Sequence, residues 1–120
     1  SAHAFHNRGK LYNEMGYYEK AKKDLDKAIY NDQKFAEAYN QRAYANTMLG
    51  NYEAALADLQ RSLSLNDKRA ETYLHYGIYH FERKAYEEAL DKFQQAASIN
   101  AELPDLQDYL RQCEEKLAMG

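Results

Sequence analysis

The chain has 120 residues, of which 45% are hydrophobic and 29% are charged, and its formal net charge is −3. This length and composition are typical of one modest globular domain. The negative net charge disfavours nucleic acid as a partner. No apolar run approaches the ~20 residues that a membrane helix needs, and the N-terminal stretch is polar. We therefore expect no membrane insertion and no signal peptide, and we favour a cytoplasmic location.

The first predicted element is a helical hairpin within residues 2–35. Gly16 lies between two amphipathic stretches, and glycine is favoured in the left-handed position that ends a helix. Only Ser1 precedes the first helix, without a recognisable capping sequence. We therefore expect the chain to be a segment of a longer protein.

The second predicted hairpin lies within residues 36–69. Gly50 and Asn51 form its turn, because both residue types tolerate a left-handed conformation. Asp67 is predicted to be the N-cap of the helix that follows. The two helices of this hairpin are predicted over residues 36–49 and 52–65.

The third predicted hairpin lies within residues 70–103 and is followed by a capping helix over residues 104–118. Lys84 stands where the earlier turns have glycine, so this turn either places a lysine at positive φ, at a cost of roughly 1 kcal/mol, or is built differently. Pro104 and Asp105 suit the start of the last helix. The apolar stripe of that helix comprises Leu106, Tyr109, Leu110, Cys113 and Leu117.

The three hairpins share matched residue types at a fixed spacing of 34 residues. Small side chains on facing helices allow the two axes to approach, and large side chains fill the space beside them. One hairpin is too thin to bury its apolar face alone, so neighbouring hairpins are expected to stack. The matched columns are Tyr18/Tyr52/Tyr86, Ala21/Ala55/Ala89, Leu25/Leu59/Phe93, Phe5/Tyr39/Tyr73 and Gly9/Ala43/Gly77.

These columns resemble the tetratricopeptide repeat (TPR) over residues 2–103. The sequence departs from the family where leucine is replaced by Arg8, Arg42 and Tyr76. The resemblance implies an all-α, right-handed superhelical solenoid of three antiparallel helix–turn–helix repeats with a C-terminal capping helix. It also implies an adaptor or scaffold whose first helices line a concave groove for a partner's peptide or helix.

The groove is predicted to combine an apolar patch with polar positions that can hydrogen-bond a peptide. An alternative is that the apolar residues, Phe81 and Ile78 above all, belong to the core. The family's carboxylate clamp for chaperone tails corresponds here to His6, Lys10, Gln41, Glu71 and His75. Because Glu71 repels a carboxylate, we predict against chaperone-tail binding of that kind. The expected contact residues are His6, Lys10, Asn40, Gln41, Tyr44, Met48, Leu74, His75 and Ile78.

The charge changes sign along the chain. Residues 2–35 carry seven Lys or Arg against five Asp or Glu, whereas residues 70–103 carry three against six. This asymmetry allows weak head-to-tail self-association, although an ordinary solvated surface also explains it. A second hypothesis for the function follows, namely a stacking or oligomerisation segment of a larger assembly without a peptide ligand.

No motif for chemistry stands out, so we expect no enzyme activity, no cofactor and no metal. His3 and His6 have a spacing that can chelate a metal on a helix, but no third ligand lies nearby in the sequence. Cys113, the one cysteine, excludes an internal disulfide and lies on the apolar stripe of the last helix. It is predicted to be a buried, inert thiol.

Overall fold

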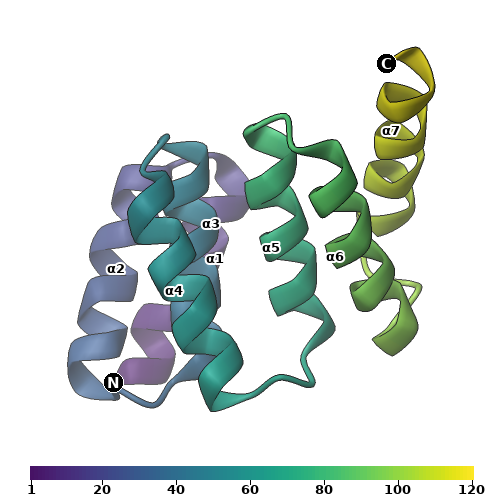
Figure 1. The fold of residues 1–120 in the computed structure, drawn as a ribbon. Helices are drawn as coiled ribbons and strands as arrows, with labels where there is room; N and C mark the ends of the chain where they lie inside the picture. Colours follow the sequence, from purple (N-terminus) through teal and green to yellow (C-terminus); the bar gives the residue numbers. More distant parts are fainter. The chain divides into compact units, whose positions relative to one another are not determined.

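A computed structural model describes all residues from 1 to 120 and contains seven α-helices and no strand (Figure 1). The chain divides into two compact units, Ser1–Asp67 and Lys68–Gly120. The division falls next to the predicted junction of the second and third repeats. The helices are α1 (Ala2–Met15), α2 (Tyr18–Asn31), α3 (Ala36–Met48), α4 (Tyr52–Leu65), α5 (Ala70–Glu82), α6 (Tyr86–Ile99) and α7 (Leu106–Met119).

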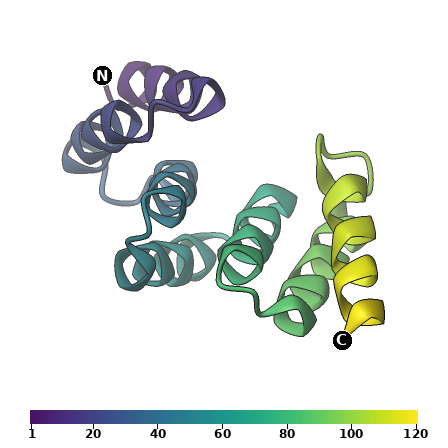
Figure 2. The ribbon, with the colours of Figure 1, turned by 90° about the horizontal axis from the view of Figure 1, so that it is seen from above.

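The first unit consists of two antiparallel hairpins, α1–α2 and α3–α4, which pack on each other through α2 and α3 (Figure 2). Gly16 and Gly50 each have a φ of 81°, which confirms both predicted glycine turns. The backbone N–H of Tyr17 donates to the carbonyl of Tyr12 at 2.8 Å, and the turn after α3 repeats this bond at the same distance. These bonds satisfy carbonyl groups at the end of each first helix.

The second unit contains one hairpin, α5–α6, with α7 packed on α6. Lys84 has a φ of 63°, so the third turn uses the same left-handed conformation despite its missing glycine. The N–H of Ala85 donates to the carbonyl of His80 at 2.9 Å, as in the glycine turns. Of the two possibilities for this turn, the structure adopts the lysine at positive φ.

The small columns lie at the closest approach of paired helices, as predicted. Ala21, Ala43, Ala55 and Ala89 have no exposed surface. A Cβ atom added to Gly77 would lie 2.5 Å from Cδ1 of Phe93, and one added to Gly9 would lie 2.8 Å from Cγ of Leu25. The hairpins therefore close only because one of the two facing positions is small.

The predicted capping helix is confirmed in its packing. Leu106 and Cys113 are fully buried, and the ring of Tyr109 stacks on Phe93 with centroids 5.1 Å apart. The other residues of the predicted stripe are half-buried. The helix thus covers the apolar side of α6 and keeps its polar residues on the surface.

Three predicted helix starts need correction. Asp67 does not cap α5, because the N-cap of that helix is Arg69. The last helix begins at Leu106, and Asp105 is its N-cap with a φ of 72° and no side-chain capping bond. Ser1 does cap α1, since its Oγ accepts a hydrogen bond from the N–H of Ala4 at 3.2 Å. Short polar residues mark a helix start within a few positions, and the path of the connecting loop decides which one is used.

None of the seven helices has both the length and the apolar character that crossing a membrane requires.

Candidate functional site

The predicted contact residues are divided between the two units. His6 and Lys10 lie on α1 of the first unit, and four others lie on α3 beside it. The remaining three lie on α5 of the second unit. The site is therefore built separately within each unit.

A buried pair of amides joins α1 to α3. Nδ2 of Asn13 donates to both the backbone carbonyl and the side-chain Oε1 of Gln41, each at 3.0 Å. The two residues are 4% and 6% exposed. The side chain of Gln41 is thus buried and hydrogen-bonded within the protein. Asn13, which was not among the predicted contacts, fixes the spacing of α1 and α3.

His6 lies at the other end of this face, and His3 lies beside it. Both imidazole rings tilt against the ring of Phe35, with centroid distances of 4.8 Å. Burial lowers the pKa of His6, because the interior disfavours the charged imidazolium, and a hydrogen bond with Asn7 and the charge of Glu37 only partly oppose this. His6 is therefore a mainly neutral, half-buried ring rather than a fixed cation.

The α3 residues differ in accessibility. Asn40 is 1% exposed, so its amide belongs to the core. Tyr44 and Met48 are half-buried, and the ring of Tyr44 meets Tyr18 edge to face at 5.9 Å. Lys10 on α1 is also half-buried. Of the predicted contacts in the first unit, His6, Lys10, Tyr44 and Met48 keep surface that a partner can reach.

The predicted apolar patch is largely buried in the second unit. Leu74 and Ile78 are 7% and 4% exposed, and Phe81 packs edge to face on Tyr86 and Tyr109. The alternative core interpretation therefore holds for Ile78, whereas Phe81 is half-buried. His75 is half-buried and remains the most accessible of the three predicted contacts on α5.

Two equivalent ion pairs, 34 residues apart in the sequence, were not predicted by the sequence interpretation. Arg8 donates from Nε and Nη2 to the two carboxylate oxygens of Asp24, at 2.7 and 2.8 Å. Arg42 binds Asp58 in the same way, at 2.9 and 2.8 Å, and its Nη1 also donates to Asp26 at 3.0 Å. Hydrogen bonds to the carboxylates raise the pKa of both arginines further above their ordinary value.

The third repeat replaces this ion pair with a contact of a different kind. Tyr76 occupies the arginine column and Lys92 the aspartate column. The Nζ of Lys92 lies 4.7 Å from the centroid of the Tyr76 ring, within the range of a cation–π contact. The departures from the family leucine thus have a structural reason, because Arg8 and Arg42 are matched by Asp24 and Asp58, and Tyr76 is matched by Lys92.

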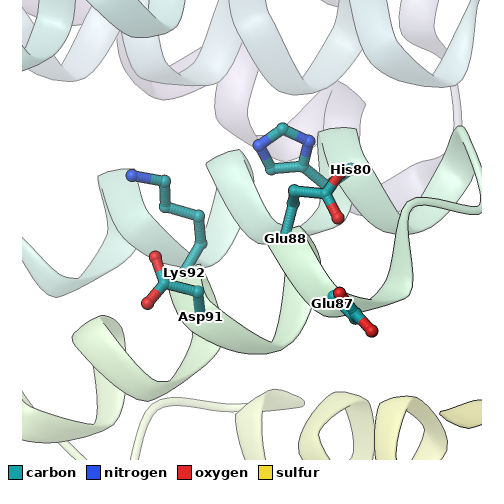
Figure 3. A pocket seen from close by; sticks show the side chains of 5 residues that line it. All are labelled: His80, Glu87, Glu88, Asp91 and Lys92. Carbon is teal, nitrogen blue, oxygen red and sulfur yellow. The ribbon is translucent and has the colours of Figure 1, made fainter.

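A shallow hollow of about 400 Å³ lies on the surface of α5 and α6, lined by His80, Glu87, Glu88, Asp91 and Lys92 (Figure 3). Glu88 lies beside His80, whereas Glu87 points away from it. Burial lowers the pKa of His80. No group of three or more His, Cys, Asp or Glu side chains has a geometry that could hold a metal ion. The hollow therefore provides no metal centre.

Cys113 does not have the environment of a nucleophile. The residue is fully buried, and burial followed by the charge of Glu114 raises the pKa of its thiol to about 11. The thiol is therefore neutral at physiological pH.

The architecture belongs to the class of all-α helical-hairpin solenoids, with three repeats and a C-terminal helix. The sequence matches family models described as tetratricopeptide repeat over residues 2–35 and 36–69. Because these matches cover more than half of the chain, the chain belongs to the tetratricopeptide repeat family. The 34-residue spacing of the matched columns extends the pattern to the third hairpin.

Solved structures of TPR domains resemble the whole chain. The first TPR domain of human RPAP3 is 22% identical, with a TM-score of 0.85, and the match covers 98% of this chain and 93% of that one. The first TPR domain of Spaghetti (RPAP3), bound to the HSP90 peptide SRMEEVD, has the same identity and coverage and a TM-score of 0.81. The TPR domain of Arabidopsis OM64 is 20% identical, with a TM-score of 0.80, and the match covers 95% of this chain and 94% of that one. At this level of identity the likeness establishes the fold.

A search of curated protein sequences found no match.

Proposed function

We propose that this chain is a protein-interaction module that binds a partner's peptide along the face formed by α1 and α3. The observation that carries the proposal is the row of half-buried side chains on this face, His6, Lys10, Tyr44 and Met48, on two helices locked together by Asn13. Half-buried aromatic and amphipathic side chains on a rigid surface can bury further area on binding at little cost in conformational entropy. The buried amide pair supplies the rigid base.

Relatives support peptide binding as the activity of this fold. The Spaghetti domain is bound to an HSP90 peptide, and the second TPR domain of human RPAP3 is in complex with the HSP70 peptide SGPTIEEVD. Here, however, the clamp positions hold His6 with a lowered pKa, buried Gln41 and the acidic Glu71. We infer a partner segment that is recognised through its side chains and backbone rather than through a terminal carboxylate.

The partner specificity can be tested directly with the HSP90 peptide SRMEEVD. A fluorescently labelled peptide titrated with the chain is expected to show no saturable binding, because its acidic terminus finds no set of fixed cations. Glu71→Lys is the matched variant, and it should improve any residual binding. Saturable binding of the peptide to the unaltered chain would contradict the inference about the partner, although not the peptide-binding function itself.

The binding face can be tested without knowing the natural partner. Peptides selected from a random displayed library on the folded chain are titrated against Lys10→Glu and Tyr44→Ala, and both variants are expected to bind at least tenfold more weakly. Lys23→Glu, an exposed change on α2, is the control and should leave binding unchanged. Failure to select any peptide, or equal binding by all variants, would leave the stacking-segment hypothesis as the better account.

A further inference from the structure

The outward side of α2 carries a row of lysines. Lys20, Lys23 and Lys27 are all exposed, and their spacing of three and four residues places them on one side of the helix. We call these three residues the basic stripe. The stripe contains no residue of the peptide-binding face formed by α1 and α3.

The acidic side chains of α2 do not neutralise the basic stripe. Asp24 binds Arg8 through both carboxylate oxygens, and Asp26 accepts a hydrogen bond from Arg42. Glu19, the remaining acidic residue of α2, forms no ion pair with a lysine. The positive charge of the stripe is therefore not balanced within its own helix.

The second hairpin shows that these positions form a free surface. The residues of α4 in the same columns are Ala54, Ala57 and Arg61, and all three are exposed. They stay exposed although the hairpin α1–α2 packs on the hairpin α3–α4 through α2 and α3. A neighbouring hairpin on the preceding side thus leaves this side of a second helix uncovered.

The third hairpin carries the opposite charge in two of these columns. Glu88 and Asp91 of α6 lie two repeats after the first two lysines of the basic stripe, and Glu87 lies beside them (Figure 3). All three carboxylates are exposed, whereas Lys92, the cation next to them, is half-buried. Asp91 accepts a hydrogen bond from the neutral amide of Gln95, which leaves its charge in place. We call the three acidic residues the acidic stripe.

We propose that the basic stripe of one copy of the chain binds the acidic stripe of a second copy, so that α2 of one molecule lies beside α6 of the other. A second copy is the partner that the structure itself supplies, because the chain carries both complementary stripes. This contact gives a location to the change of charge between residues 2–35 and 70–103. It involves neither α1 nor α3, so the proposal does not depend on the proposed function.

The two stripes match in spacing as well as in sign. Each contains one pair of like charges three residues apart and one pair four residues apart, which is about 4.5 and 6 Å along a helix axis. Two ammonium groups can therefore meet two carboxylates at the same time. The contact is expected to be weak and sensitive to salt, because exposed ion pairs are screened by solvent and ions.

A crosslinking experiment shows which groups meet and whether they come from different molecules. Unlabelled and isotope-labelled chains are mixed at about 10 mM salt, where the Debye length is ~30 Å. A water-soluble carbodiimide then joins lysines to carboxylates in contact, with loss of water. Mass spectrometry of the digest is expected to find mixed-isotope crosslinks between the two stripes. At about 1 M salt, where the Debye length is ~3 Å, these crosslinks should fall at least tenfold.

Sedimentation velocity of variants at low salt tests the same contact without crosslinking. Lys20→Glu with Lys23→Glu should weaken self-association at least tenfold, because it replaces attraction by repulsion. Addition of Glu88→Lys and Asp91→Lys to that variant exchanges the charges of both stripes at an unchanged net charge, and it should restore association. Circular dichroism checks that all variants fold, as expected for changes at exposed positions.

A matched control separates the stripes from the effect of net charge. Lys34→Glu with Lys84→Glu changes two exposed lysines outside the basic stripe by the same total charge and should retain association. The proposal would be overturned by a monomer at every concentration at low salt, by mixed crosslinks spread evenly over the lysines, or by a four-residue exchange that fails to restore association. A chain that stays monomeric but binds polyglutamate through the basic stripe would assign the stripe to a different acidic protein and would also contradict the proposal.

Discussion

The contact of Gly77 with Phe93 makes a quantitative prediction about the third hairpin. A Cβ atom at position 77 would lie 2.5 Å from Cδ1 and 2.9 Å from Cζ of the Phe93 ring, which has no exposed surface and no free direction in which to move. Overpacking of a core costs about 1–3 kcal/mol, and this contact belongs at the upper end. Alanine is preferred over glycine within a helix by about 1 kcal/mol, so Gly77→Ala should lower the free energy of unfolding by about 2 kcal/mol.

The second hairpin suggests the variant that should rescue this loss. It combines Ala43 with Leu59, and both are fully buried. In a Phe93→Leu background, Gly77→Ala should therefore raise the free energy of unfolding by about 1 kcal/mol, since only the helix preference remains. Together the two backgrounds imply a coupling energy of about 3 kcal/mol between the two positions, at the upper end for residues in contact.

The assay is urea unfolding followed by far-UV circular dichroism on the four proteins of this double-mutant cycle. Gly9→Ala is a further comparison, because its new Cβ would meet the flexible side chain of Leu25, which can shift more easily than an aromatic ring. We expect Gly9→Ala to be clearly milder than Gly77→Ala. The reasoning about the small column would be refuted if Gly77→Ala had the same effect with phenylalanine and with leucine at position 93.

Three other properties can be tested in the same way. Arg42→Met leaves the buried carboxylate of Asp58 without its main hydrogen-bond donors and should lower the free energy of unfolding, measured by urea unfolding, by about 2 kcal/mol. Arg42→Met combined with Asp58→Leu should recover most of this loss, and no recovery in the double variant would contradict the reasoning. Lys84→Gly should stabilise the chain by up to about 1 kcal/mol, measured by thermal unfolding, because the residue has a φ of 63°; a lower melting temperature would show that the lysine side chain contributes more than the strain costs. Burial lowers the pKa of His6 and of His80 below the ordinary 6.5, so the unfolded chain binds more protons than the folded chain just below that pH. The contribution of the two neutral histidines to stability should therefore be complete above pH 6.5 and fall as the pH drops through their lowered pKa values. Urea midpoints measured across this range test the prediction, and a variant with glutamine at both positions should lose the dependence.

The elements that could be predicted from the sequence are those fixed by packing between residues at a constant spacing. Gly77 and Phe93 show why, since a small residue on one helix and a large residue on its partner are needed in every hairpin, and each repeat supplies another example of the pair. Gly16 and Gly50 ended their helices where expected, because their conformation is a local property of the chain. The same local reasoning was wrong at Asp67, where the position of the cap depends on the path of the connecting loop.

The candidate site could be predicted only in part, because its character depends on contacts between residues far apart in the sequence. Asn40 and Gln41 were expected to offer amides to a partner, but Gln41 accepts a hydrogen bond from Asn13 and Asn40 is almost completely buried. A helical face can be assigned from residue spacing. Whether a second helix covers that face is decided by the neighbouring repeat, which spacing alone does not describe.

The repeated arginines show how such hidden contacts could be found. Arg8 and Arg42 are departures from the family pattern, and departures at one column are usually assigned to the surface. Asp24 and Asp58 recur at the same spacing, however, and a basic and an acidic column that recur together imply a pair in each hairpin. The third repeat supports this interpretation because both columns change at once. A lysine in the aspartate column could not replace the carboxylate beside an arginine, whereas beside the ring of Tyr76 it lies within the range of a cation–π contact.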